Sequence, residues 1–257
     1  MQQTTYKQDH TFDLPVTRQV SLNAPVRWLK AGWSDFRRTP LASGFYGLMF
    51  VLLAYAVTLT SWQSPVLMLS LVGGFFLVTP FLAMGLYDLS RQVEQTEHVG
   101  FLSSLIAFKQ NKADVGLLVV FHAIVMIAWI RLGTIIGALY IGSNGTSVSV
   151  LFEELWRSGE GLQMMAVFTV AGAVIAAAVF ITSVISWPMI LDRREGAIHA
   201  MATSVKVVMH NKLVMLTWAA SIGLLFVVGI ATFYLGLLII IPILGHATWH
   251  AYKELVE

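Results

Sequence analysis

Apolar segments long enough to cross a membrane recur along the chain, separated by shorter polar segments. A helix needs roughly 17–25 mostly apolar residues to span the hydrocarbon core of a bilayer. Six segments meet this requirement, and they pair into three helical hairpins, so the sequence predicts an all-α integral membrane protein. The expected layout is a polar N-terminal segment, 1–23, and a single transmembrane domain, 24–257, with spans at about 41–60, 65–87, 115–135, 162–190, 213–233 and 236–252.

The stretches before the three hairpins carry charges but also place apolar residues at helical spacing. In residues 195–211 the apolar residues recur mostly at intervals of three and four, which is typical of a helix with one apolar side. Residues 24–38 and 97–110 show the same pattern. Each stretch is predicted to form an amphipathic helix that lies along the membrane surface. The apolar sides comprise Val26, Leu29, Trp33 and Phe36; Phe101, Leu102, Leu105, Ile106 and Phe108; and Ile198, Met201, Val205, Val208 and Met209.

The composition agrees with a membrane location and excludes several functions. Hydrophobic residues make up 57% of the chain and charged residues only 12%, which is too apolar for a soluble enzyme of 257 residues. A net charge of +2 gives no reason to expect nucleic acid as a partner. The absence of cysteine rules out disulfides and thiolate ligands. No motif of a known catalytic site is present, so we do not expect an enzyme.

Basic residues are distributed unequally between the two sides of the predicted membrane domain. Of the 16 Lys and Arg residues, all but Arg131 and Arg157 lie before the first span, in the two longer junctions or in the C-terminal tail. Positively charged loops remain in the cytoplasm, so both termini and the three surface helices are expected there. We expect contacts with anionic lipids or a protein partner at this surface. The residues expected to make them are Trp28, Arg37, Arg38, Lys109, Lys112, Arg193, Arg194 and Lys212.

Few polar side chains fall inside the predicted spans, and these form the candidate site. His122 and His246 lie at similar predicted depths in the third and sixth spans, where they could meet. His246 and His250 are four residues apart, so both rings lie on one helix face and could bind a metal ion or a haem iron. The alternative is that these histidines form hydrogen bonds to neighbouring helices. Arg131 lies near the outer end of its span, where it either anchors the helix or gates a substrate path.

An internal repeat links two of the junctions. The stretch from Ser104 to Lys112 reads SLIAFKQNK and the stretch from Ser204 to Lys212 reads SVKVVMHNK. Both begin with Ser and end with Asn-Lys directly before a span. We interpret the chain as three units of one surface helix and one hairpin, and in the looser first unit residues 33–40 stand at this boundary. Repeats of this kind occur in transporters, and they also arise by duplication of a stable hairpin.

The C-terminal block PILGHATWHAY, residues 242–252, together with the six-span layout resembles the bacterial integral membrane family known as domain of unknown function 2189. The resemblance covers most of the chain after the polar N-terminus. It implies a protein of the bacterial inner membrane, and some members are labelled as similar to cytochrome c oxidase subunit I. A catalytic oxidase subunit needs more histidine ligands than the three membrane histidines of this sequence. The resemblance therefore implies at most an accessory role near respiratory complexes.

Three functions are compatible with these features. The leading hypothesis is a non-enzymatic scaffold, assembly or accessory factor that acts through protein or lipid contacts and needs no cofactor. The second is a small transporter built on the repeat. The third is a haem- or metal-binding protein, associated with a respiratory oxidase, that uses His246 and His250. Small residues in the stretch 171–178 allow close helix packing within the chain or in a homodimer.

Overall fold

The computed structural model describes residues 14–61, 79, 82–96, 99–141, 159–193 and 195–256. Arg194 and most of the predicted span 65–87 lie outside these residues. Within them, every regular element is a helix, apart from one isolated antiparallel bridge between Thr17 and Val256. The helices are α1 (Ala24–Arg38), α2 (Pro40–Ser61), α4 (Phe101–Leu105), the 3-10 helix η1 (Ala107–Asn111), α5 (Lys112–Ile141), α7 (Gly159–Ser183), α8 (Ser186–Arg193), α9 (Ala197–His210), α10 (Lys212–Ala231) and α11 (Leu237–Leu255). Residues 82–95 are also helical.

Two predicted helices are divided in the structure. The surface helix expected at 97–110 consists of the short helix α4 and the 3-10 helix η1, which meet at Ile106. The span expected at 162–190 ends as α7 at Ser183 and continues as α8 after a turn at residues 184–185. Pro188 lies in the first turn of α8, where its missing N–H group would have had no partner within the helix.

Four helical stretches among the described residues are long and apolar enough to cross a membrane. They are Pro40–Leu59, Ala107–Tyr140, Gly161–Arg193 and Lys212–Ala231. The predicted sixth span, within α11, is not one of them, and the predicted second span lies mostly outside the described residues. The structure therefore supports an all-helical membrane protein with four candidate spans, and six crossings stay a prediction.

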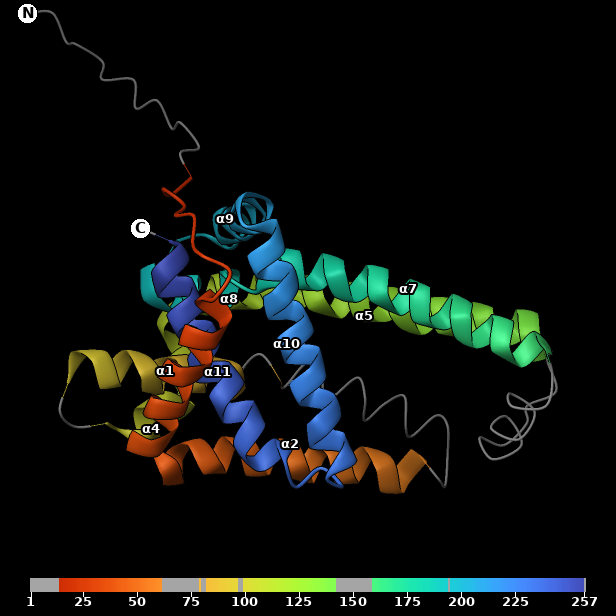
Figure 1. The fold of residues 1–257 in the computed structure, drawn as a ribbon, viewed down its shortest axis with the longest axis horizontal. Coiled ribbons are helices and arrows are strands. Elements are labelled where there is room, and N and C mark those ends of the chain that lie inside the picture. The colour runs from red at the N-terminus through yellow and green to blue at the C-terminus, as the bar shows by residue number, and fades with distance from the viewer. Residues whose placement is uncertain are drawn as a thin grey trace, which may run out of the picture.

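The long helices run in two directions (Figure 1). Helices α5 and α7 lie side by side along the long axis and project away from the rest of the molecule, and α2 also follows this axis. Helices α1, α10 and α11 run across it. This arrangement differs from a single bundle of near-parallel helices. Close crossings allow it: a Cβ atom at Gly47 on α2 would overlap the backbone of Leu238 on α11, so only glycine fits there.

Helix α11 forms the centre of the described structure. It packs against α1, α2, α8 and α10. Its buried residues include Trp249 and Tyr252, neither of which has any exposed surface. Beside it, the rings of Trp28 on α1 and Trp218 on α10 meet edge to face with centroids 5.5 Å apart, a favoured aromatic geometry. The core is therefore built around the last helix of the chain.

The surface helices bury their small and polar side chains and expose many of their large apolar ones. On α1, Gly32 and Asp35 are buried, whereas Trp33 is 42% exposed. On α9, Ala200 and Ser204 are buried and Ile198 is 71% exposed. The apolar sides that the sequence indicates thus point largely away from the protein core. Trp28 is an exception to the expected surface contacts, because it is 1% exposed and its Nε1 donates to Glu254.

Each of the helices α1, α4 and α9 packs on a long helix from another part of the chain. The contact is made by a small residue eight positions before the next long helix. Ser204 on α9 donates to the carbonyl oxygen of Ile181 in α7, and Ser104 on α4 lies 2.8 Å from the Tyr46 hydroxyl on α2. Gly32 on α1 holds the same position, where a Cβ would lie 2.5 Å from the carbonyl oxygen of Ile243 on α11. Residues at the same position of α1, α4 and α9 thus each contact a different long helix.

Candidate functional site

A chain of polar side chains crosses the junction of α1, α2, α11 and the helix 82–95. At its buried end, His246 has no exposed surface, and each of its ring nitrogens has a hydroxyl partner. Nε2 lies 2.8 Å from Ser43 Oγ on α2, and Nδ1 lies 2.7 Å from Ser90 Oγ. Thr39 Oγ1 lies 2.8 Å from Ser43 Oγ and extends the chain to the start of α2. The histidine thus joins three segments that are far apart in sequence.

The chain continues from Ser90 toward the protein surface. Ser90 Oγ donates to Asp35 Oδ2 at 2.8 Å, and the same oxygen lies 2.8 Å from His250 Nε2. His250 Nδ1 is 3.7 Å from Glu94 Oε1, which accepts a hydrogen bond from Trp249 Nε1 at 3.0 Å. Asp35 is almost wholly buried, whereas the side chains of His250 and Glu94 are partly exposed. A continuous polar path therefore connects the surface with buried His246.

Asp35 is the buried acid of this network. Burial alone would raise the pKa of its carboxyl group, but the hydrogen bond from His250, the charge of that ring and the hydrogen bond from Ser90 favour the carboxylate more strongly. The pKa of Asp35 therefore lies below its ordinary value of 3.8. At neutral pH the network holds a carboxylate that accepts hydrogen bonds from two sides.

The hydroxyl protons of the network limit the protonation of His246. Ser90 gives its single proton to Asp35, so Nδ1 of His246 must donate to Ser90. Thr39 donates to the carbonyl oxygen of Asp35, so the Ser43 hydroxyl can donate either to Thr39 or to Nε2 of His246. In a neutral ring, Nδ1 therefore carries the proton, and the single Ser43 proton can fill only one of the two contacts, with Thr39 or with Nε2. In a charged ring Nε2 would also donate, so each of these contacts would have its own proton.

The two histidines of the predicted metal site are brought together, but their nitrogens are occupied. Both nitrogens of His246 contact hydroxyl groups, and those of His250 face Asp35 and Glu94. The part of the chain that the structure describes holds no group of three His, Cys, Asp or Glu side chains that could bind a metal ion. A metal or haem iron at His246 would have to break a hydrogen bond that links α11 to a neighbouring helix. The arrangement is that of a structural cross-link.

His122 has different partners and is not part of this network. Its Nδ1 lies 2.7 Å from the carbonyl oxygen of Leu118 and its Nε2 lies 3.0 Å from Ser183 Oγ on α7. Because a carbonyl only accepts, Nδ1 carries the proton and Nε2 accepts from the serine. His122 therefore ties α5 to α7, and the expected meeting of His122 with His246 is replaced by two separate contacts.

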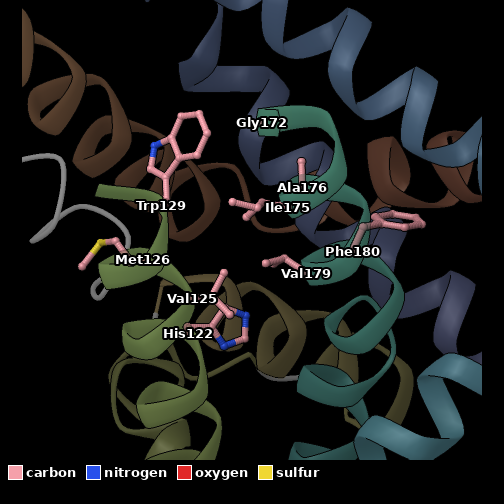
Figure 2. A pocket seen from close by; sticks show the side chains of 9 residues that line it. All are labelled: His122, Val125, Met126, Trp129, Gly172, Ile175, Ala176, Val179 and Phe180. Atoms are coloured by element: carbon pink, nitrogen blue, oxygen red, sulfur yellow. The ribbon is translucent and has the colours of Figure 1, made fainter. Parts of the chain in front are cut away.

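A half-enclosed cavity of about 480 Å3 lies between α5 and α7, with His122 at one end and Trp129 at the other (Figure 2). All other lining side chains are aliphatic, thioether or phenyl groups. The lining residues are His122, Val125, Met126, Trp129, Gly172, Ile175, Ala176, Val179 and Phe180. The sequence indicates the small residues of α7 but not this cavity, because its shape depends on how the two helices pack.

The basic residues predicted to contact lipid or a partner fall into two groups. Arg193 is used inside the protein: its Nε donates to the Tyr252 hydroxyl at 3.0 Å and its Nη2 donates to the carbonyl oxygen of Val256 at 3.3 Å. The others that the structure describes are exposed, as is Arg131 on α5. These are Arg37, Arg38, Lys109, Lys112 and Lys212. Arg193 thus differs from the prediction, because it holds the end of α11 in place.

Asp35, Ser43 and Ser90 belong to the site but are not predicted from the sequence. One signal was available on α1, where Trp28, Gly32, Asp35 and Thr39 recur at intervals of three and four and so share one helix face. All four are buried. An acid on a buried face needs partners, so this spacing could have identified Asp35 as part of a polar cluster.

These features define the class of the protein. Its apolar helices, their uncovered side chains and the four candidate spans are those of an integral membrane protein. Residues 66–192 match the sequence model of a family described as predicted integral membrane protein (DUF2189), which agrees with the family that the sequence resembles. The match lies outside the block 242–252 on which the resemblance was based. No curated protein and no solved structure matches the chain.

Proposed function

We propose that the protein is a non-enzymatic scaffold, assembly or accessory factor of the bacterial cytoplasmic membrane that acts through contacts with lipid and with other membrane proteins. The uncovered surface of α5 and α7 carries this proposal. Within the most apolar 18 residues of Gly161–Arg193 no residue is buried, and within those of Ala107–Tyr140 only 11% are buried. Apolar surface of this extent is stable only against lipid or against another protein.

Charge on the surface helices supports the lipid part of the proposal. Arg37 lies 6.0 Å from the centre of the Trp33 ring, and Arg38 follows it at the end of α1. Each exposed basic residue near an anionic bilayer contributes about 1 kcal/mol to attraction, and tryptophan is favoured at the membrane interface. With both termini in the cytoplasm, these side chains would meet the inner leaflet.

The structure gives less support to the two alternatives. A transporter needs a polar path across the membrane, whereas the polar network connects one surface only with the completely buried His246, and the cavity at His122 has an apolar lining. A haem or metal protein needs free ligand nitrogens, whereas those of His246 are both engaged by hydroxyl groups. The scaffold or accessory function requires neither, so it accounts for more of what is observed.

Affinity purification in a mild detergent tests the proposal. We expect a specific membrane-protein partner or anionic phospholipid to co-purify with the wild-type chain. The double variant Arg37→Gln, Arg38→Gln should retain several-fold less anionic lipid than the control Arg131→Gln. The control changes an exposed arginine in the C-terminal half of α5. A monodisperse protein without partner or lipid, or equal lipid retention by both variants, would contradict the proposal.

A further inference from the structure

We propose that the cavity between α5 and α7 holds one acyl chain of a membrane phospholipid. This inference rests on the proposed contact of these helices with lipid and names the part of the lipid that is bound. The cavity of about 480 Å3 falls within the range of roughly 300–1,000 Å3 that is typical of small-molecule sites. It is therefore large enough for a specific occupant.

The chemistry of the lining favours a hydrocarbon. His122 is the only titratable lining residue, and its two nitrogens are already engaged by Leu118 and Ser183. Trp129 has one N–H group, and no lining side chain is charged. A ligand with buried polar groups would lose their hydration and find few partners here. A methylene chain has no such groups, so the cavity suits it best.

The location of the cavity decides which hydrocarbon can reach it. Both of its walls belong to candidate membrane spans, Ala107–Tyr140 and Gly161–Arg193. The helix surfaces on either side carry exposed aliphatic side chains, including Ile124 on α5 and Val174 on α7. A cavity between such surfaces opens to the bilayer core, where acyl chains are the surrounding solvent.

The small residues of α7 shape the space. Gly172 and Ala176 lie on the cavity wall one turn apart, and between them there is little side-chain volume (Figure 2). A Cβ at Gly172 would lie 3.2 Å from the ring of Trp129, so that ring lies against nearly bare backbone. The result is a short channel that begins beside the imidazole and ends at the indole.

A helix from a second copy of the chain fits less well than an acyl chain. The lining extends from His122 to Trp129, which at the helical rise corresponds to about 10 Å along α5. This is about two helical turns, a contact much smaller than a stable interface between two protein chains, which buries roughly 1,200 Å2 or more. An acyl chain needs no such area, so it is the favoured occupant.

Native mass spectrometry of the full-length protein, purified in detergent and washed to remove loose lipid, tests the inference. We expect the wild-type chain to retain one phospholipid. Ala176→Phe fills the cavity and should reduce this retention at least fivefold. Ala177→Phe changes the neighbouring exposed alanine, which does not line the cavity, and should retain lipid as the wild type does. Equal retention by the two variants, no adduct in the wild type, or a dimer that only Ala176→Phe disrupts would overturn the inference.

A second measurement applies if Ala176→Phe fails to fold. The fluorescence of Trp129 is obtained as the difference in emission between the wild type and Trp129→Phe. This fluorescence should be much weaker in vesicles of phospholipid brominated along the acyl chain than in vesicles of unbrominated lipid. Unquenched Trp129 emission would mean that acyl chains do not enter the cavity. Lipid bound through its headgroup alone, with equal retention by both alanine variants, would refute the inference and leave the proposed function intact. One retained acyl chain, without any protein partner and without a preference for anionic lipid, would support the inference and contradict the proposed function.

Discussion

Ser43 on α2 and His246 on α11 lie 203 positions apart in the chain, and their side chains are 2.8 Å apart in the structure. The second ring nitrogen of the same histidine contacts Ser90, which connects it to Asp35 on α1. One imidazole thus links α2, near the start of the described chain, with its last helix, α11. Because α11 packs against most of the other described core helices, this linkage should be important for stability.

Removal of the Ser43 hydroxyl tests the linkage. Ser43→Ala leaves Nε2 of His246 buried without a partner, which should cost about 1–3 kcal/mol of folding stability. We expect a lower Tm for the variant in detergent. Ser221→Ala on α10 is the control, because that hydroxyl donates only to the carbonyl oxygen of Thr217 in its own helix. Equal Tm values for the two variants would show that the His246 contacts do not contribute to stability.

The carboxylate of Asp35 should make stability depend on pH in acid. Its pKa in the folded protein is below 3.8, so its contribution is complete above that pH and is lost as the pH falls through the folded-state pKa. We expect the Tm of the wild type to fall more steeply below pH 3.8 than that of Asp35→Asn, which cannot lose this charge. Parallel pH profiles of the two proteins would contradict the assigned role of Asp35.

At the point where α2 and α11 cross, only glycine should be tolerated. Gly47→Ala forces a methyl group into the backbone of Leu238 and should lower the Tm markedly. Gly44→Ala on the same helix meets no atom within 4 Å and should be neutral or stabilising by up to about 1 kcal/mol, since alanine favours helix. If both substitutions had the same effect, α2 and α11 would not cross as closely as the structure indicates.

Local features of the fold were predictable from the sequence. The sequence predicts separate helices at 213–233 and 236–252, and in the structure α10 ends at Ala231 and α11 begins at Leu237. Phe233 and Tyr234 in this turn both have positive φ angles, of 53° and 66°. Surface helix α1 also has the predicted bounds. In each case the signal lies within a few neighbouring residues.

Long-range relationships were not predictable in this way. Periodicity shows that His246 and His250 share a helix face, but it does not show that Ser43, Ser90 and Asp35 surround them, because these partners come from other helices. The same holds for the cavity at His122, which depends on the pairing of α5 with α7. The correspondence of Gly32 with Ser104 and Ser204 also becomes visible only from the contact that each residue makes with another helix.

Helices α5 and α7 are proposed to present their apolar surface to the bilayer, and spin labelling tests this orientation most directly. The chain contains no cysteine, so single cysteines can be placed at Ile124, which is 61% exposed, and at Val174, which is 65% exposed, with no other thiol present. A third label at the exposed Lys253 provides an aqueous control. In vesicles containing only this protein, we predict that both helix labels are accessible to oxygen and shielded from a water-soluble nickel chelate, with the reverse for Lys253. Labels at Ile124 and Val174 that are shielded from both reagents, or open to nickel, would contradict the account.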